Sequence, residues 1–118
     1  MHLIPFIVPV VLLILSNVFM TFAWYGHLKF PQMSLWIVVL VSWALAFFEY
    51  WLAVPANRIG YQVYSMAELK TIQVVIALTV FTIITVVFFG EKITAQHVIG
   101  FCLIGTGAGL IFTAKGGL

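Results

Sequence analysis

The polar side chains of this sequence are concentrated in one stretch, and their types suit the binding of a charged solute. The stretch AFFEYWLAVPANRIGYQVYSMAELKTIQ, from Ala46 to Gln73, holds two glutamates, an arginine, a lysine, an asparagine and two glutamines. Carboxylates accept hydrogen bonds and attract cations, and amides both donate and accept hydrogen bonds. The stretch is therefore either a binding site or only the place where an apolar chain enters water.

Glu49 is the first candidate for a binding role. Ser42, Ala46 and Ala53 share a helical face with Glu49, because spacings of three and four residues return to the same side of a helix. This face is small and polar, so we expect it to point towards other helices. The alternative is that Glu49 reaches the interface with water or pairs with Arg58.

A second group of candidates opens the next apolar segment. Glu68, Lys70 and Gln73 stand there. Arg58, Tyr61, Ser65 and Glu68 recur at helical spacing, so the polar stripe continues back through the preceding connection if that stretch is helical. If this polar stripe is buried, Lys70 or Arg58 is the partner of Glu68. The alternative is a helix N-terminus, where Glu68 interacts favourably with the helix dipole and Lys70 lies at the lipid headgroups.

A third group of candidates begins with two polar residues in the middle of the first apolar segment and includes aromatic residues of later segments. Ser16 and Asn17 are adjacent polar residues there, and an asparagine at that depth forms hydrogen bonds between helices or contacts a ligand. Trp43 either faces lipid or lines a cavity, and we expect Tyr61 and Tyr64 to help shape that cavity. The predicted binding site for substrate or protons consists of nine residues: Glu49, Glu68, Asn17, Trp43, Tyr61, Tyr64, Arg58, Lys70 and Gln73.

The last apolar segment is rich in small residues. Gly105 and Gly109 form a G-x-x-x-G motif within HVIGFCLIGTGAGLIF. Small residues allow helices to approach closely, so this motif predicts a surface for helix packing or dimerisation. Cys102, the single cysteine, lies in the same segment and is interpreted as a packing residue.

The composition identifies the solvent of the protein as a lipid bilayer. Of 118 residues, 64% are hydrophobic and 7% are charged, and the mean hydropathy is +1.23. A soluble domain of this length has too little interior to bury so much apolar surface. The net charge of +2 is spread thinly, without the basic patch that nucleic-acid binding needs.

Four apolar segments have the length of a membrane span, about 20 residues. They cover residues 4–25, 35–54, 69–89 and 97–114, and a polar segment lies at 55–68. Unpaired backbone groups are not tolerated in lipid, so the segments must be helices. We therefore predict one all-α, integral membrane domain over residues 1–118, with the first segment retained as a helix. Glu49 would then lie about five residues, or about 7 Å, inside the second span.

Several classes of function are not supported by any motif. The histidines and the cysteine lack the spacing of a metal site, and no nucleophile elbow, P-loop or dinucleotide fingerprint is present. The prediction is a non-enzymatic protein without cofactor or metal. Its expected partners are the lipid bilayer, a second copy of the chain and a small-molecule substrate. We expect a multi-pass protein of the cell membrane, which is the inner membrane in a Gram-negative bacterium.

Several motifs together resemble the drug/metabolite transporter superfamily. They are VPANR after the second segment, FFGEKIT after the third, and the glycine-rich fourth segment. The layout is similar to the small multidrug resistance branch, whereas FEYWLAVPANRIGY and ELKTIQ resemble an uncharacterised four-helix family placed in the superfamily. The resemblance implies an exporter or exchanger that works as a dimer. It also implies a ligand between helices one to three and dimer contacts through helix four.

The sequence departs from the small multidrug resistance pattern at one important position. Proteins of that branch carry a glutamate in the first helix that binds both proton and cation, and Asn17 stands at the corresponding position here. Asparagine does not titrate, so Glu49 or Glu68 must supply the carboxylate if transport is coupled to protons. We therefore predict a dimeric transporter of a small polar or cationic metabolite. The alternative is a non-transporting scaffold or accessory subunit of a larger membrane complex.

Overall fold

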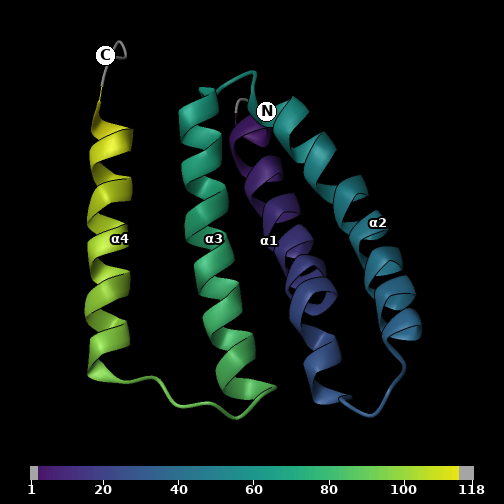
Figure 1. Cartoon of the computed structure of the whole chain (residues 1–118). Coiled ribbons are helices and arrows are strands. Elements are labelled where there is room, and N and C mark those ends of the chain that lie inside the picture. The colour runs from purple at the N-terminus through teal and green to yellow at the C-terminus, as the bar shows by residue number, and fades with distance from the viewer. Residues whose placement is uncertain (1–2, 115–118) are drawn as a thin grey trace.

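The computed structural model describes residues 3–114, so the two ends of the predicted 1–118 domain lie outside this range. Within the range, four α-helices and one short 3-10 helix follow one another (Figure 1). They are α1 (Ile4–Tyr25), η1 (Gly26–Lys29), α2 (Leu35–Gly60), α3 (Met66–Val87) and α4 (Ala95–Thr113). All four α-helices are long and apolar enough to cross a membrane. The predicted all-α integral membrane fold is confirmed.

Helix α1 is the centre of the packed part of the molecule. It lies between α2 and α3 and packs against both of them (Figure 1). More of its residues are buried than those of any other helix in the described range: Pro9, Leu13, Ser16, Asn17, Thr21 and Ala23. Two of these, Ser16 and Asn17, are polar and less than 2% exposed, so the core contains hydrogen-bonding groups as well as apolar ones.

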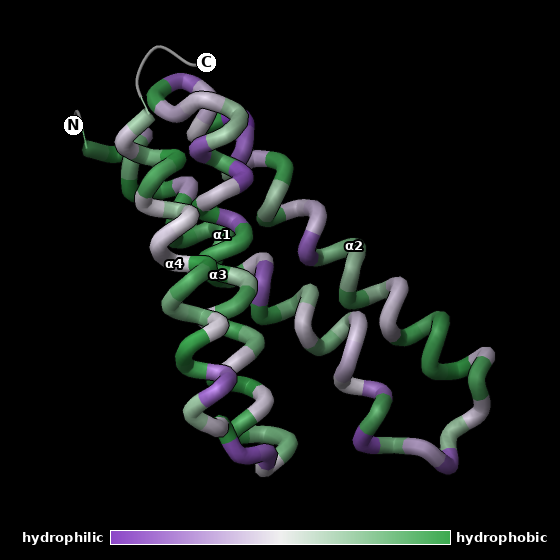
Figure 2. Tube along the Cα trace, turned by 60° about the vertical axis from the view of Figure 1, so that its left-hand side comes forward, coloured by the Kyte–Doolittle hydropathy of each residue, from purple (hydrophilic) through white to green (hydrophobic). Residues whose placement is uncertain are grey.

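The outer surfaces of the helices suit a hydrocarbon solvent. Hydrophobic residues cover most of the length of the helices, and hydrophilic residues gather at the connections (Figure 2). Large apolar side chains such as Trp36, Leu40 and Phe47 are more than half exposed. In water this exposure would be costly, but in a bilayer these side chains contact lipid tails.

Helix α2 is longer than predicted, and it ends at Gly60 rather than at residue 54. Pro55 lies inside the helix, where it has no N–H to donate to the preceding turn. Packing outweighs this loss, because Ala56 is fully buried and Gly60 is also buried. The first six residues of the predicted polar segment 55–68 are therefore part of α2.

Helices α3 and α4 also start earlier than predicted, because each has a capping box at its N-terminus. The Ser65 hydroxyl accepts a hydrogen bond from the Glu68 backbone, and the Glu68 carboxylate accepts one from the Ser65 backbone, so α3 starts at Met66 rather than at residue 69. Thr94 and His97 form the equivalent pair, and α4 covers 95–113 rather than 97–114. Helix α3 ends at Val87, two residues before the predicted end.

Gly60 marks the point where three helices meet. A Cβ atom at this position would lie 2.6 Å from Leu69 Cδ2 in α3 and 3.2 Å from Pro9 Cβ in α1. Only a residue without a side chain allows the end of α2 to approach both neighbours this closely. The glycine therefore fixes the distance between α2 and α3 at the membrane end where the connection 61–65 joins them.

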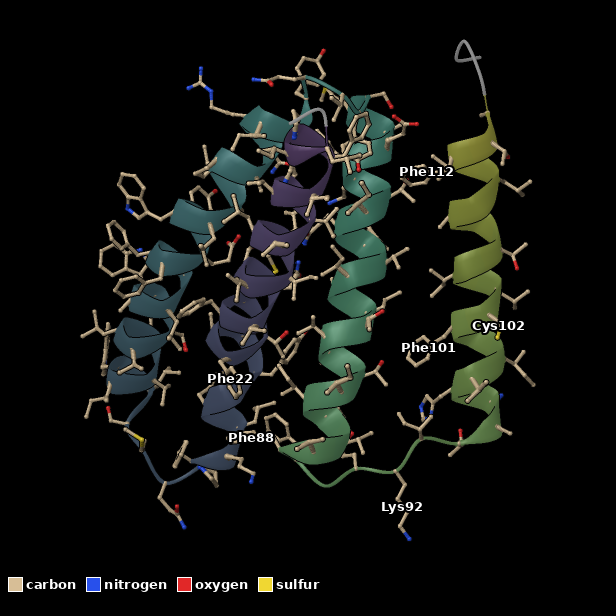
Figure 3. All side chains as sticks on the ribbon, turned by 180° about the vertical axis from the view of Figure 1, so that it is seen from behind. Phe22, Phe88, Lys92, Phe101, Cys102 and Phe112 are labelled. Carbon is tan, nitrogen blue, oxygen red and sulfur yellow. The ribbon has the colours of Figure 1, made fainter. Side chains whose placement is uncertain are left out.

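Helix α4 stands beside α3 and has no buried residue in the described range (Figure 1). Phe101 and Phe112 point from α4 towards α3, whereas Cys102 points away from it (Figure 3). Cys102 is exposed, so its interpretation as a packing residue does not hold within this chain. The reason is that no other helix of the chain covers that side of α4.

The junction at Gly60 gives a prediction about stability. Gly60→Val should lower the free energy of unfolding by about 1–3 kcal/mol, because the new side chain would overlap Leu69 and Pro9. Unfolding by SDS titration in mixed micelles measures this change. Gly26→Val is the control, since a Cβ at Gly26 lies no closer than 3.4 Å to its neighbours. Equal losses in the two variants would contradict the close approach at Gly60.

Candidate functional site

A groove with a volume of about 740 Å³ lies between α2 and α3. Helix α1 forms its floor through Leu13 and Met20, and apolar residues of α2 and α3 contribute Val54 and Leu69. Its polar and aromatic lining comes from both sides: Glu49, Tyr50, Asn57, Arg58, Tyr61, Lys70 and Gln73. Five of the predicted site residues, Glu49, Arg58, Tyr61, Lys70 and Gln73, therefore line one groove.

Glu49 is the deep acidic group of this groove. Its side chain is 7% exposed, and its Oε2 accepts a hydrogen bond of 2.8 Å from the hydroxyl of Ser16, which is fully buried. The partner of Glu49 is thus a hydroxyl on α1, and the alternative pairing with Arg58 is not observed. No buried side-chain oxygen or nitrogen in residues 3–114 lacks a hydrogen-bond partner. The second carboxylate oxygen has no hydrogen-bond partner among the described residues, so it is not fully buried, and Glu49 lines the groove.

Asn17 and Gln73 form a reciprocal amide pair between α1 and α3. Asn17 Nδ2 donates to Gln73 Oε1 at 2.9 Å, and Gln73 Nε2 donates to Asn17 Oδ1 at 3.2 Å. Asn17 Nδ2 also donates to the carbonyl oxygen of Leu13 at 2.8 Å. Both donors of the Asn17 amide are occupied, and its side chain is 1% exposed. Asn17 thus links two helices and fixes the position of Gln73 at the edge of the groove.

Two adjacent residues of α1 therefore bind helices on two different sides. Successive residues of a helix point about 100° apart, so Ser16 and Asn17 project in different directions. Ser16 reaches Glu49 in α2, while Asn17 reaches Gln73 in α3. As a result, Glu49 and Gln73 approach the same depth of the groove from opposite walls.

Basic side chains lie towards the end of the groove that is nearest the connection 61–65. Arg58 is near the end of α2 and Lys70 is near the start of α3, and both residues are exposed and line the groove. In the described part of the chain, Glu49 is bonded to Ser16 and Glu68 to Ser65, and neither is paired with Arg58 or Lys70. The groove thus carries an acidic group deep inside and two cationic groups nearer its mouth.

Besides the buried Asn17, three residues of the predicted site lie outside the groove. Glu68 accepts a hydrogen bond of 2.9 Å from the Ser65 backbone, which is the helix N-terminus alternative of the sequence analysis. The Tyr64 hydroxyl donates to the carbonyl oxygen of Phe6, and the Tyr64 ring packs edge-on against the Phe6 ring. Trp43 is 71% exposed on a different face of α2. These three side chains therefore do not contribute to the surface of the groove.

The glycines of α4 lie away from the groove as well. Gly105 borders a smaller space of about 260 Å³ between α3 and α4. A Cβ added at Gly105 or at Gly109 would find no atom of the described chain within 4 Å. The G-x-x-x-G motif is thus not used for close packing between helices of the same chain.

Ser16 is the functional candidate whose role the sequence analysis did not assign. It was noted only as a neighbour of Asn17, yet it is the hydrogen-bond partner of Glu49. A serine next to an asparagine in the middle of an apolar span is a recognisable signal, because both groups need partners in lipid. Tyr50 was likewise not assigned, although it lines the groove beside Glu49.

The fold and the groove define a multi-pass integral membrane protein with a polar site between its helices. Residues 9–112 match the family described as "Putative member of DMT superfamily (DUF486)". This match spans most of the sequence, so the chain belongs to that family, and the resemblance to the drug/metabolite transporter superfamily is confirmed. Proteins of this superfamily are transporters rather than enzymes. Neither the curated proteins nor the solved structures gave a match.

A double-mutant cycle tests whether Asn17 and Gln73 stabilise the protein as a pair or independently of each other. Asn17→Leu and Gln73→Leu should each destabilise the protein, because each leaves the other amide without its partner. The double variant should lose less than the sum of the two single losses, with a coupling energy of about 1 kcal/mol. SDS titration in mixed micelles measures all four proteins. Additive losses would show that the two amides do not act as a pair.

Proposed function

We propose that this protein transports a small polar or cationic metabolite across the cell membrane, with Glu49 as the group that binds charge. The observation that carries the proposal is the enclosed carboxylate of Glu49 in the wall of a groove of about 740 Å³. An ionisable side chain in the membrane is costly and is a functional candidate for that reason. Membership of a drug/metabolite transporter family supports the same conclusion.

The hydrogen bond from Ser16 suits a carboxylate that exchanges its ligand. It holds Oε2 in place, while the other oxygen has no hydrogen-bond partner among the described residues and is not fully buried. A cation or a proton arriving through the groove would neutralise the charge of Glu49 and reduce the cost of keeping it in the membrane. Because both would bind the same carboxylate, binding of a cationic substrate and of a proton would be mutually exclusive.

The test measures transport by variants in which one glutamate, inside or outside the groove, is replaced by glutamine. Glu49→Gln should reduce transport at least tenfold, since glutamine keeps the size of the side chain but removes its charge. Glu68→Gln and Glu91→Gln are the matched controls, because Glu68 serves in the capping box and Glu91 lies in the connection between α3 and α4. Uptake of radiolabelled choline, butylamine and 4-aminobutyrate into proteoliposomes measures transport. Full transport by Glu49→Gln would overturn the proposal.

A homodimer forms the second part of the proposal. Helices α1, α2 and α3 enclose the groove only in part, and α4 has no buried residue in the described range. A second copy packed on α4 through Gly105 and Gly109, along the incompletely filled space between α3 and α4 that Gly105 borders, would cover this helix. Small residues at this position allow the close approach that such a contact needs.

The dimer contact is tested by enlarging the motif. Gly105→Leu combined with Gly109→Leu should shift the protein from dimer to monomer, because no atom of the same chain lies within 4 Å to be disturbed. Gly107→Leu is the control, since residue 107 lies on nearly the opposite side of the helix from both. Light scattering in detergent measures the mass of the protein. A stable dimer in the double variant would place the contact elsewhere.

The same purified material tests the alternative of a non-transporting accessory subunit. Affinity purification from native membranes should yield the protein as a dimer with no other protein in fixed ratio. A different protein recovered at a constant ratio, together with no uptake of any of the three solutes, would favour the accessory subunit over the transporter.

A further inference from the structure

We propose that the ligand of the groove is zwitterionic, with an ammonium group at Glu49 and a carboxylate or phosphate group at Arg58 and Lys70. This inference rests on the proposed function, in which Glu49 binds the charged solute. It adds the chemical class of that solute, which a carboxylate alone would not define. The evidence is the distribution of charge and apolar surface along the groove.

The acidic end of the groove is built for a group that donates hydrogen bonds. Glu49 offers an accessible oxygen, and Gln73 stands at the opposite wall because its amide is paired with Asn17. An ammonium group has three N–H donors, so it can bind a carboxylate oxygen and a neighbouring side-chain or aromatic group together. Tyr50, the neighbour of Glu49 in α2, lines the same groove.

The basic end is built for an anionic group. Arg58 and Lys70 come from different helices and line the groove from both sides. Neither forms an ion pair with a carboxylate in the described part of the chain, where Glu49 and Glu68 are bonded to serines. A carboxylate or phosphate between them would accept charge-assisted hydrogen bonds from both cations.

A solute with one charge satisfies only one end of the groove. The charged lining residues are one acidic and two basic side chains, so the groove has a net charge of +1 from Glu49, Arg58 and Lys70. A simple cation is attracted by Glu49 but repelled by two cations along the same path. A simple anion meets the reverse arrangement at Glu49. A zwitterion has an attractive partner for each of its charges.

The space between the two ends suits a short aliphatic spacer. Leu13, Met20 and Leu69 contribute apolar lining to the groove. Glu49 precedes Arg58 by nine residues of α2, so the backbone rise between them is about 13.5 Å. The side chains of both residues and their hydrogen bonds to the ligand take up part of this length, so a solute whose charged groups are several bonds apart, such as 4-aminobutyrate or phosphoethanolamine, suits the groove better than glycine.

This ligand chemistry has two sources, a soluble zwitterion or the headgroup of a lipid. Phosphatidylethanolamine carries the same ammonium and phosphate groups, and its acyl chains would remain in the bilayer while the headgroup enters the groove. The test therefore needs one arm with soluble zwitterions in detergent and one arm with lipids in nanodiscs.

In the first arm, the complete protein in detergent is titrated with 4-aminobutyrate, butylamine and butyrate, followed by calorimetry. These three probes have the same chain length and differ only in their charged groups. We expect 4-aminobutyrate to bind at least tenfold more tightly than butylamine or butyrate. Arg58→Gln combined with Lys70→Gln should remove this preference and leave butylamine binding unchanged or stronger.

Lys92→Gln is the matched control, because Lys92 extends from the connection between α3 and α4, away from the helices (Figure 3). This variant should keep the preference for 4-aminobutyrate. Equal binding of 4-aminobutyrate and butylamine to the unaltered protein, with binding lost in Glu49→Gln, would overturn a soluble zwitterion as the ligand and leave the proposed function intact. Solute binding that Glu49→Gln does not change would overturn the proposed function itself.

In the second arm, thermal unfolding is compared in nanodiscs containing phosphatidylethanolamine or phosphatidylglycerol, which lacks the ammonium group. A higher midpoint in phosphatidylethanolamine that disappears in both Glu49→Gln and the Arg58/Lys70 double variant supports the lipid source. Absence of a preference in this arm and in the first arm would overturn the inference.

Discussion

The structure depends on the hydrogen bonds of two adjacent polar residues in a helix that lies within lipid. Hydrocarbon offers no hydrogen-bond partners, so the hydroxyl of Ser16 and the amide of Asn17 must find theirs in neighbouring helices. They do so in different directions, with Ser16 bonded to Glu49 in α2 and Asn17 bonded to Gln73 in α3. This requirement makes α1 the central helix and brings one acidic and one amide side chain to the same depth.

The groove is a consequence of how these three helices are held. Helices α2 and α3 are each attached to α1, and their ends approach closely at Gly60, where α1, α2 and α3 meet. Away from this junction a space remains between α2 and α3, with α1 as its floor. A solute in this space contacts both walls, so its binding would favour one distance between α2 and α3 over others. Alternating access requires this type of coupling between binding and helix position.

Helix α4 differs from the other three in its relation to the chain. It is long and apolar enough for a membrane span, yet none of its described residues is buried, and a Cβ added at any of its glycines would meet no atom of the described chain within 4 Å. Lipid can cover an apolar helix without cost, so the exposure alone does not require a partner. Four glycines in such a helix favour close approach of another helix over contact with lipid, and for this reason we propose that a second copy covers this surface.

The sequence by itself determined the class of the protein and the number of its spans, because long apolar segments have one stable conformation in a bilayer. It also indicated Glu49 as a residue facing other helices, since the small and polar residues around it recur at helical spacing. The Ser-x-x-Glu pattern of Ser65 and Glu68 would have given the start of α3, because it is local. Only the tertiary structure decided that Ser16 is the partner of Glu49, that Asn17 pairs with Gln73, and that Trp43 and Tyr64 lie outside the groove. These facts depend on the rotation and depth of each helix relative to its neighbours, and apolar segments of nearly uniform hydrophobicity do not encode that rotation.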